Sequence, residues 1–146
     1  VMSKQVLDIS QMQHLEELGV DTSNANFYWH RTISLNNYND WDEWKLHYGV
    51  LRLARGFTTI NCQYVRTFTL QDILDLLPNL IESQDEGNNY WLEFETATED
   101  EEWWYIRYMS VYGVKLNYEE DEHLIDAAYE MLCWCIENEY VRTESN

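Results

Sequence analysis

The first clear pattern of apolar residues along the chain is helical. Apolar residues repeat at three-residue steps within 11–18, and Ser10 and Gln13 have the spacing of a capping box. Gly19 stands where a helix usually ends in a left-handed conformation, with Val20 following it as the apolar contact of that motif. The pattern predicts a helix over 11–18.

Alternating residues rich in aromatic and β-branched types predict three strands after this helix. They lie near 26–34, from Trp44 to about residue 50, and over 59–66. The polar stretch 35–42 is typical of a loop. A change of parity in the apolar positions predicts a bulge or bend near Gly49.

Thr69 and Asp72 form a second capping-box pattern, and leucine and isoleucine follow at the spacing of a buried helical stripe. Pro78 lacks the N–H that a helix interior needs, so the regular helix is expected to end there. Leu80 and Ile81 are expected in one further helical turn.

Three alternating runs between 90 and 118 predict an antiparallel meander. In one register the strands place nine aromatic or aliphatic residues on one face of the sheet: Tyr90, Leu92, Phe94, Trp104, Ile106, Tyr108, Val114, Leu116 and Tyr118. On the opposite face, the same register can pair Glu93 and Glu95 with Arg107 and Lys115.

A broad apolar stripe over 124–136 predicts the last helix, with Cys133 on its far side among the acids. The helix is expected to start in the acidic cluster Glu119–Glu122, which suits the positive end of a helix dipole. The expected order is therefore α-β-β-β-α-β-β-β-α. It indicates one α+β domain over 1–146, with about three helices packed on antiparallel sheet.

Charge narrows the range of partners. The 146 residues include 27 acids and 9 bases, a net charge of −18. This balance argues against direct binding to nucleic acid or to an anionic membrane. The charge is uneven, because residues 1–81 hold 9 acids and 6 bases whereas 82–146 hold 18 acids and 3 bases.

The sequence also bears on location. No window approaches roughly 18 consecutive apolar residues, so no membrane-spanning helix is expected. The first eight residues lack the features of a signal peptide, and three cysteines are an odd number without framework spacing. These features favour a cytoplasmic protein with free thiols.

No catalytic or cofactor-binding motif is present, so no catalytic residue and no cofactor are assigned. Cys133 and Cys135 are two apart on a predicted helix and point apart, so they cannot share one metal. A zinc site formed by Cys62, one helix cysteine and a distant histidine is the less favoured alternative. Thiols that fill a core, with no metal, are the favoured interpretation.

Aromatic residues are abundant, at 7 Trp, 11 Tyr and 4 Phe. Trp41, Trp91, Trp103 and Trp134 fall outside the predicted core faces. Such residues commonly anchor protein interfaces, and they can also stack on sugar rings. A second small core is the structural alternative to both.

Two strings, TLQDILDLLP at 69–78 and LIDAAYEMLCWCIE at 124–137, resemble segments of small uncharacterised proteins encoded by gut anaerobic bacteria and their phages or prophages. That family has no assigned activity, cofactor or site residues. The resemblance implies a shared fold over the second and third helices and a prokaryotic or viral cytoplasmic setting.

These observations lead to the hypothesis of a non-enzymatic accessory protein of a phage or mobile element that binds another protein. The acidic half is explained either by solubility alone or, in the sharper form of the hypothesis, by a basic partner. The alternatives are a nucleic-acid mimic that occupies a DNA-binding protein, a carbohydrate-binding module, and a small enzyme without a recognisable motif. The candidate partner-binding residues are acidic, with one tryptophan: Glu99, Asp100, Glu101, Glu102, Trp103, Glu119, Glu120, Asp121 and Glu122.

Overall fold

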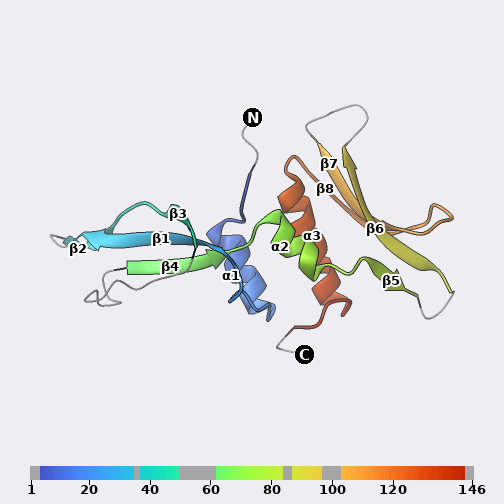
Figure 1. The fold of residues 1–146 in the computed structure, drawn as a ribbon, viewed down its shortest axis with the longest axis horizontal. Helices are drawn as coiled ribbons and strands as arrows, with labels where there is room; N and C mark the ends of the chain where they lie inside the picture. Colours follow the sequence, from blue (N-terminus) through green and yellow to red (C-terminus); the bar gives the residue numbers. More distant parts are fainter. Residues whose placement is uncertain (1–3, 35–36, 50–61, 84–86, 97–102, 144–146) are drawn as a thin grey trace.

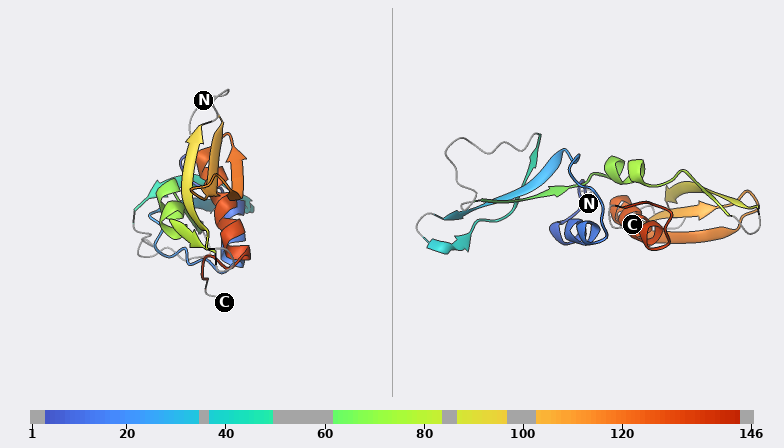
Figure 2. Two further views of the ribbon diagram at one scale, coloured as in Figure 1. Left: turned by 90° about the vertical axis from the view of Figure 1, so that its right-hand side faces the viewer. Right: turned by 90° about the horizontal axis from the view of Figure 1, so that it is seen from below.

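The computed structural model describes residues 4–34, 37–49, 62–83, 87–96 and 103–143. Within these residues, three helices form the middle of an elongated molecule, and an antiparallel sheet lies toward each end (Figures 1 and 2). The expected α+β class is confirmed. Each half contains one more strand than the sequence predicted.

The N-terminal sheet is built around β1 (Phe27–Ser34). β3 (Lys45–Tyr48) and β4 (Cys62–Thr67) pair with its two edges, both antiparallel. β2 (Asn37–Trp41) pairs with the last residues of β1, so the expectation of a loop there was wrong. Backbone hydrogen bonds pair β2 with β1. Such pairing does not require alternating apolar side chains, so the sequence pattern did not indicate this strand. β3 ends before Gly49, whose φ is 116°.

Helix α1 (Ile9–Glu17) begins two residues before the predicted start. Its N-cap is Asp8 and not Ser10, because the Asp8 carboxylate accepts the N–H of Gln11 at 2.9 Å. Gln11 accepts the N–H of Asp8 in return, which completes the capping box. Gly19 has a φ of 92°, so the expected left-handed end is confirmed.

Helix α2 (Leu70–Leu76) has the capping box predicted from Thr69 and Asp72. The residue before Pro78 is extended, at φ −74° and ψ 134°, so the helix ends as expected. The further helical turn is wrong: the chain enters β5 (Leu80–Glu82), which pairs with the next strand. An extended residue before proline leads directly into a strand.

The C-terminal sheet has the order β5-β6-β7-β8. The meander is confirmed as β6 (Asn89–Thr96), β7 (Trp104–Met109) and β8 (Lys115–Asp121). The register of β8 shifts between Tyr108 and Met109, where the pairing of the two strands is irregular. This shift changes which side chains of β8 face the helices.

The expectation that all nine apolar residues share one face is therefore wrong for residues of the last of the three runs. Tyr118 pairs with Arg107 and lies on the face away from the helices, whereas Glu119 pairs with the buried Ile106. Val114, which immediately precedes β8, is also exposed. The acidic run Glu119–Glu122, predicted to open the last helix, instead forms the end of β8 and the turn after it.

Helix α3 (Leu124–Glu137) is buried on most sides, since it contacts α2, β7 and β8. Met131 and Leu132 are fully buried, as the apolar stripe predicted. Cys133 is also buried and not on an exposed acidic side as expected. Because α3 packs against several elements, side chains outside the predicted apolar stripe are buried as well.

A polar contact links the N-terminal segment to α3. Lys4 Nζ lies 2.8 Å from Asp126 Oδ1, and Gln11 Nε2 donates to the same oxygen at 2.8 Å. Lys4 also donates to Gln11 Oε1 at 2.9 Å. These three side chains hold α1 beside the first turns of α3.

We expect Leu132→Ala to lower the free energy of unfolding by about 2–5 kcal/mol, because it removes a fully buried side chain and leaves a cavity. The measurement is equilibrium unfolding in urea. The matched control is Leu76→Ala in α2, whose side chain is 37% exposed and whose loss should cost less than about 1 kcal/mol. Equal losses for the two variants would contradict the assigned core.

Alkylation should separate the three cysteines. Burial raises the pKa of the Cys133 and Cys135 thiols to about 11, whereas Cys62, expected to be buried, is only half-buried. The thiolate is the reactive form, so iodoacetamide at pH 8 should label Cys62 first. Mass spectrometry of native and urea-unfolded protein tests this order, and rapid native labelling of Cys135 would refute it.

Candidate interaction surface

One face of the C-terminal sheet has no described element packed against it. The helices cover the opposite face, which carries the buried Tyr90, Ile106 and Tyr108. The open face, called the outer face below, is arranged in three cross-strand rows over β6, β7 and β8. The rows are Trp91–Met109–Lys115, Glu93–Arg107–Tyr118 and Glu95–Tyr105–Glu120.

Arg107 occupies the centre of the outer face. Its Nε lies 2.6 Å from Glu93 Oε1, and its Nη2 lies 3.0 Å from Glu95 Oε1. The hydrogen bond that Arg107 donates to Glu93 stabilises the charged guanidinium and raises the pKa of Arg107. The predicted pairing of these acids with Arg107 is confirmed. Lys115 instead stands over the Tyr118 ring, 5.3 Å from its centroid.

Aromatic side chains project from this face. Trp91 is 50% exposed and Tyr118 is 51% exposed. A hollow of about 360 Å³ lies beside Tyr118, lined by Tyr105, Arg107, Lys115, Tyr118 and Glu120. The face thus offers exposed rings beside a depression with charges of both signs. This composition is typical of a protein interface.

The acidic candidates of β8 are distributed over two sides. Glu120 lies on the outer face, and Glu122 is exposed in the turn before α3. Glu119 and Asp121 are half-buried toward the helices, where Asp121 Oδ1 accepts the N–H of His123 at 2.9 Å. The structure therefore leaves two of these four carboxylates freely accessible.

The remaining candidates are less informative. Glu99, Asp100, Glu101 and Glu102 lie outside the described residues, and Trp103 is half-buried just before β7. Tyr118 is the surface residue that sequence reasoning missed, because its alternation assigned it to the core. The alternation of the strands had already placed three residues on the face opposite the predicted core: Trp91, Tyr105 and Met109. Their positions were the sequence signal for this surface.

The other tryptophans outside the predicted core have structural contacts. The Arg31 guanidinium lies 4.9 Å from the Trp41 ring centroid and 4.5 Å from that of Trp44. Trp134 packs on the main core, with Tyr108 and Tyr140 as ring neighbours. The prediction that Trp134 falls outside the core was therefore wrong.

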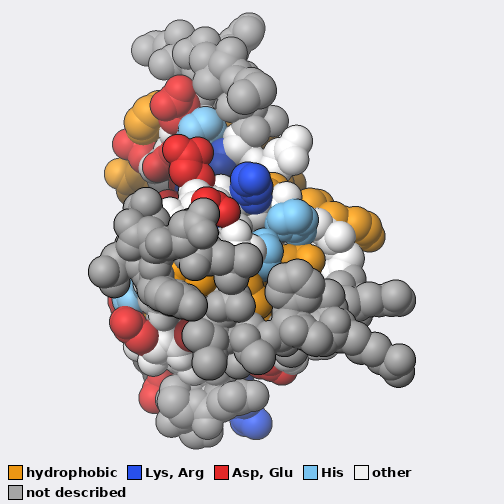
Figure 3. Space-filling model, turned by 90° about the vertical axis from the view of Figure 1, so that its left-hand side faces the viewer, with side chains coloured by type: hydrophobic (Ala, Val, Ile, Leu, Met, Phe, Trp, Pro, Cys, Tyr) orange, Lys and Arg blue, Asp and Glu red, His pale blue; other side chains and the backbone are white. Residues whose placement is uncertain are grey.

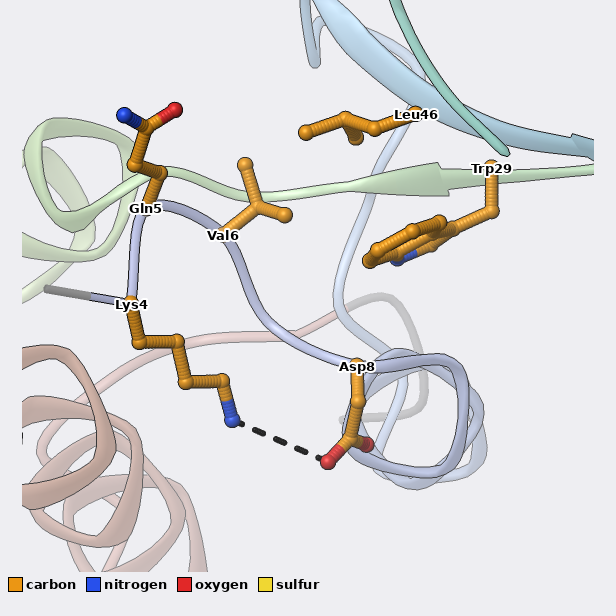
Figure 4. Close-up of a pocket in the computed structure, with 6 residues that line it drawn as sticks. All are labelled: Lys4, Gln5, Val6, Asp8, Trp29 and Leu46. Atoms are coloured by element: carbon orange, nitrogen blue, oxygen red, sulfur yellow. Dashed lines mark ion pairs between the residues drawn. The ribbon is translucent and has the colours of Figure 1, made fainter. Parts of the chain in front are cut away.

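A second hollow, of about 320 Å³, lies between the N-terminal segment and the N-terminal sheet (Figure 4). Trp29 and Leu46 line one side and Lys4 and Asp8 the other. These polar groups have structural partners: Lys4 pairs with Asp8 and Asp126, and Trp29 Nε1 donates to the Leu7 carbonyl. Asp8 is exposed, and although partial desolvation opposes its ionisation, its hydrogen bonds and Lys4 lower the pKa of its carboxyl. No group here is placed for acid–base chemistry.

Comparison with models of known protein families found no match, and none was found among curated proteins or solved structures. Among the described residues, no helix is long and apolar enough to span a membrane. No cluster of histidine, cysteine and carboxylate side chains in that part of the chain is suited to hold a metal.

The carboxyl of Glu130 should show in the pH dependence of stability. Desolvation and the charges of Glu119 and Asp121 raise its pKa in the folded state. The folded chain then binds this proton more tightly than the unfolded chain, so the ionised group lowers stability at pH 7 and not at low pH. Glu130→Gln should raise the melting temperature at pH 7, and the gain should disappear toward pH 4. Glu137→Gln on the same helix is the control, and a gain that persists at pH 4 would contradict the assignment.

Proposed function

We propose that the chain is a non-enzymatic accessory protein of a phage or mobile element that binds a basic protein through the outer face of its C-terminal sheet. The proposal rests mainly on one observation. The outer face carries Trp91 and Tyr118, each about half exposed, with no described element covering them. Burying such rings against a partner is the most productive way for a small surface to gain affinity.

Charge supports a basic partner. The half of the chain that forms this sheet holds 18 acids and 3 bases, and Arg107 is already paired with Glu93 and Glu95. A negative surface attracts a positive protein during encounter and repels a phosphate backbone. We therefore expect this end of the molecule to bind a protein and to make no direct contact with nucleic acid or membrane.

The setting comes from the sequence alone. The strings at 69–78 and 124–137 resemble proteins of gut anaerobes and their phages, which favours the bacterial cytoplasm. Neither polar hollow described above contributes a competing catalytic arrangement. A binding role thus agrees with the open aromatic face and with the structural use of the polar groups.

The test is capture of partners from host lysate, followed by binding kinetics with the captured protein. The double variant Trp91→Ala/Tyr118→Ala should weaken binding by at least about tenfold, because both rings lose their contacts. Tyr112→Ala is the matched control, since this residue is 82% exposed in the turn before β8 and lies off the face. Equal capture by the double variant and the control would refute the assigned face.

Salt and charge variants test the electrostatic part separately. Association should slow as the Debye length falls from about 30 Å at 0.01 M salt to about 8 Å at 0.15 M. Glu120→Gln/Glu122→Gln should slow association more than it speeds release, because both carboxylates are exposed. An association rate that ignores both changes would mean that the acids only keep the protein soluble.

A further inference from the structure

The N-terminal sheet has an open face that differs in chemistry from the acidic end. Register aligns one cation and two rings in each of two neighbouring cross-strand rows over β3, β1 and β4. Residues two apart on a strand are about 7 Å apart, so the rows lie side by side. We call these six residues the aromatic–basic face: His47, Tyr28 and Arg66 in the first row, Lys45, His30 and Tyr64 in the second.

The rings of this face form one cluster. Tyr28 and His47 stack with centroids 5.4 Å apart and an interplanar angle of 15°, and His30 meets His47 edge-on at 5.4 Å. His47 is exposed and Tyr64 is 43% exposed. The opposite face turns toward the N-terminal segment that precedes α1, because Trp29 there donates to the Leu7 carbonyl. The rings of His47 and Tyr64 are therefore presented to solvent, and those of Tyr28 and His30 are half-buried between their neighbours.

Among the described residues, no carboxylate forms an ion pair with Lys45 or Arg66. Arg66 Nη1 donates to the Ala25 carbonyl at 3.1 Å, which holds the guanidinium in place, and Glu16 of α1 lines the same hollow as Arg66 without forming an ion pair with it. The basic region ends at the next row, where the Thr32 hydroxyl donates to Asp42. In the view of this end, basic and histidine side chains lie beside hydrophobic ones, and acidic side chains lie next to them (Figure 3).

The net charge of −18 does not describe this surface. The two sheets lie toward opposite ends of the long axis, with the helices between them (Figures 1 and 2). One helix is about 10 Å across, which exceeds the Debye length of about 8 Å at 0.15 M salt. The acids of the C-terminal half are therefore largely screened at the aromatic–basic face.

We propose that the aromatic–basic face binds single-stranded nucleic acid. Bases stack on the exposed rings, and backbone phosphates lie against Lys45 and Arg66. Stacking on aromatic rings beside cations is how proteins hold single strands without reading their sequence. A duplex keeps its base faces stacked internally, and an acidic peptide has no planar groups for the rings. This site is separate from the proposed protein-binding surface, so each proposal can fail alone.

The experiment is fluorescence anisotropy with a labelled 15-nucleotide oligo-dT, with oligo-rU of the same length as a second arm. Two phosphate contacts predict that log K falls with log salt at a slope of about −1.4 between 50 and 200 mM. Lys45→Ala should reduce this slope to about −0.7. Tyr64→Ala should weaken binding about tenfold or more at every salt concentration, because one stacked base is lost.

Two matched variants control for exposure and charge. Tyr48→Ala removes a ring that is 73% exposed on the other face of the same sheet, and Lys115→Ala removes a cation of the C-terminal sheet. Both should bind oligo-dT like the wild type. Binding of either oligonucleotide that is weakened by Tyr64→Ala and Lys45→Ala but not by the two control variants supports the proposal. Comparison of the affinities for oligo-dT and oligo-rU shows which nucleic acid is preferred.

Other results would overturn it. They are no binding of either oligonucleotide at 50 mM salt, equal loss with Tyr48→Ala or Lys115→Ala, or equal affinity for duplex DNA or an oligo-glutamate peptide. Tyr64→Leu keeps the bulk without the ring, and it replaces Tyr64→Ala if that variant melts early. Thermal melts of every variant separate lost binding from lost folding.

Discussion

The main chain of Leu7 is the point at which the N-terminal sheet is attached to the helical core. Its carbonyl accepts hydrogen bonds from Trp29 Nε1 at 3.0 Å and from the Thr67 hydroxyl at 2.7 Å, and its N–H donates to the Phe68 carbonyl at 3.0 Å. Its side chain is fully buried among the helices. Leaving a buried polar group unpaired costs about 1–3 kcal/mol, so these bonds tie the N-terminal sheet to the core in one arrangement.

This attachment explains why both sheets keep an open face. The three helices share one core, and each sheet meets that core from its own end. A sheet needs to bury only one face to be stable, and the other is then available to solvent or a partner. The N-terminal sheet is the extreme case, since Thr67 is the one residue of β1, β3 and β4 with described burial that is buried. The fold thus leaves two open sheet faces of different chemistry around one small core.

The sequence predicted the parts of the fold that depend on local chemistry. The Thr69 capping box, the left-handed Gly19 and the helix end before Pro78 were found because each depends on residues a few positions apart. The register of β8 could not be found that way. Its shift is set by pairing with Tyr108, and nothing in the alternation around Tyr118 indicates where a strand slips by one residue. One slip moved an aromatic ring from the expected core to the candidate surface.

The same limit applies to charge. A net value of −18 treats all residues as one point, and on that basis nucleic acid was excluded for the whole chain. The register of β1 with β3 and β4 places Lys45 and Arg66 in adjacent rows with rings and no carboxylate between them. Screening at physiological salt acts over about 8 Å, so a partner meets the charges within reach and not the sum over the molecule. Two cations without a carboxylate in their rows can therefore give one end of an acidic protein a local charge that the net value hides, and where those charges lie is a property of the fold.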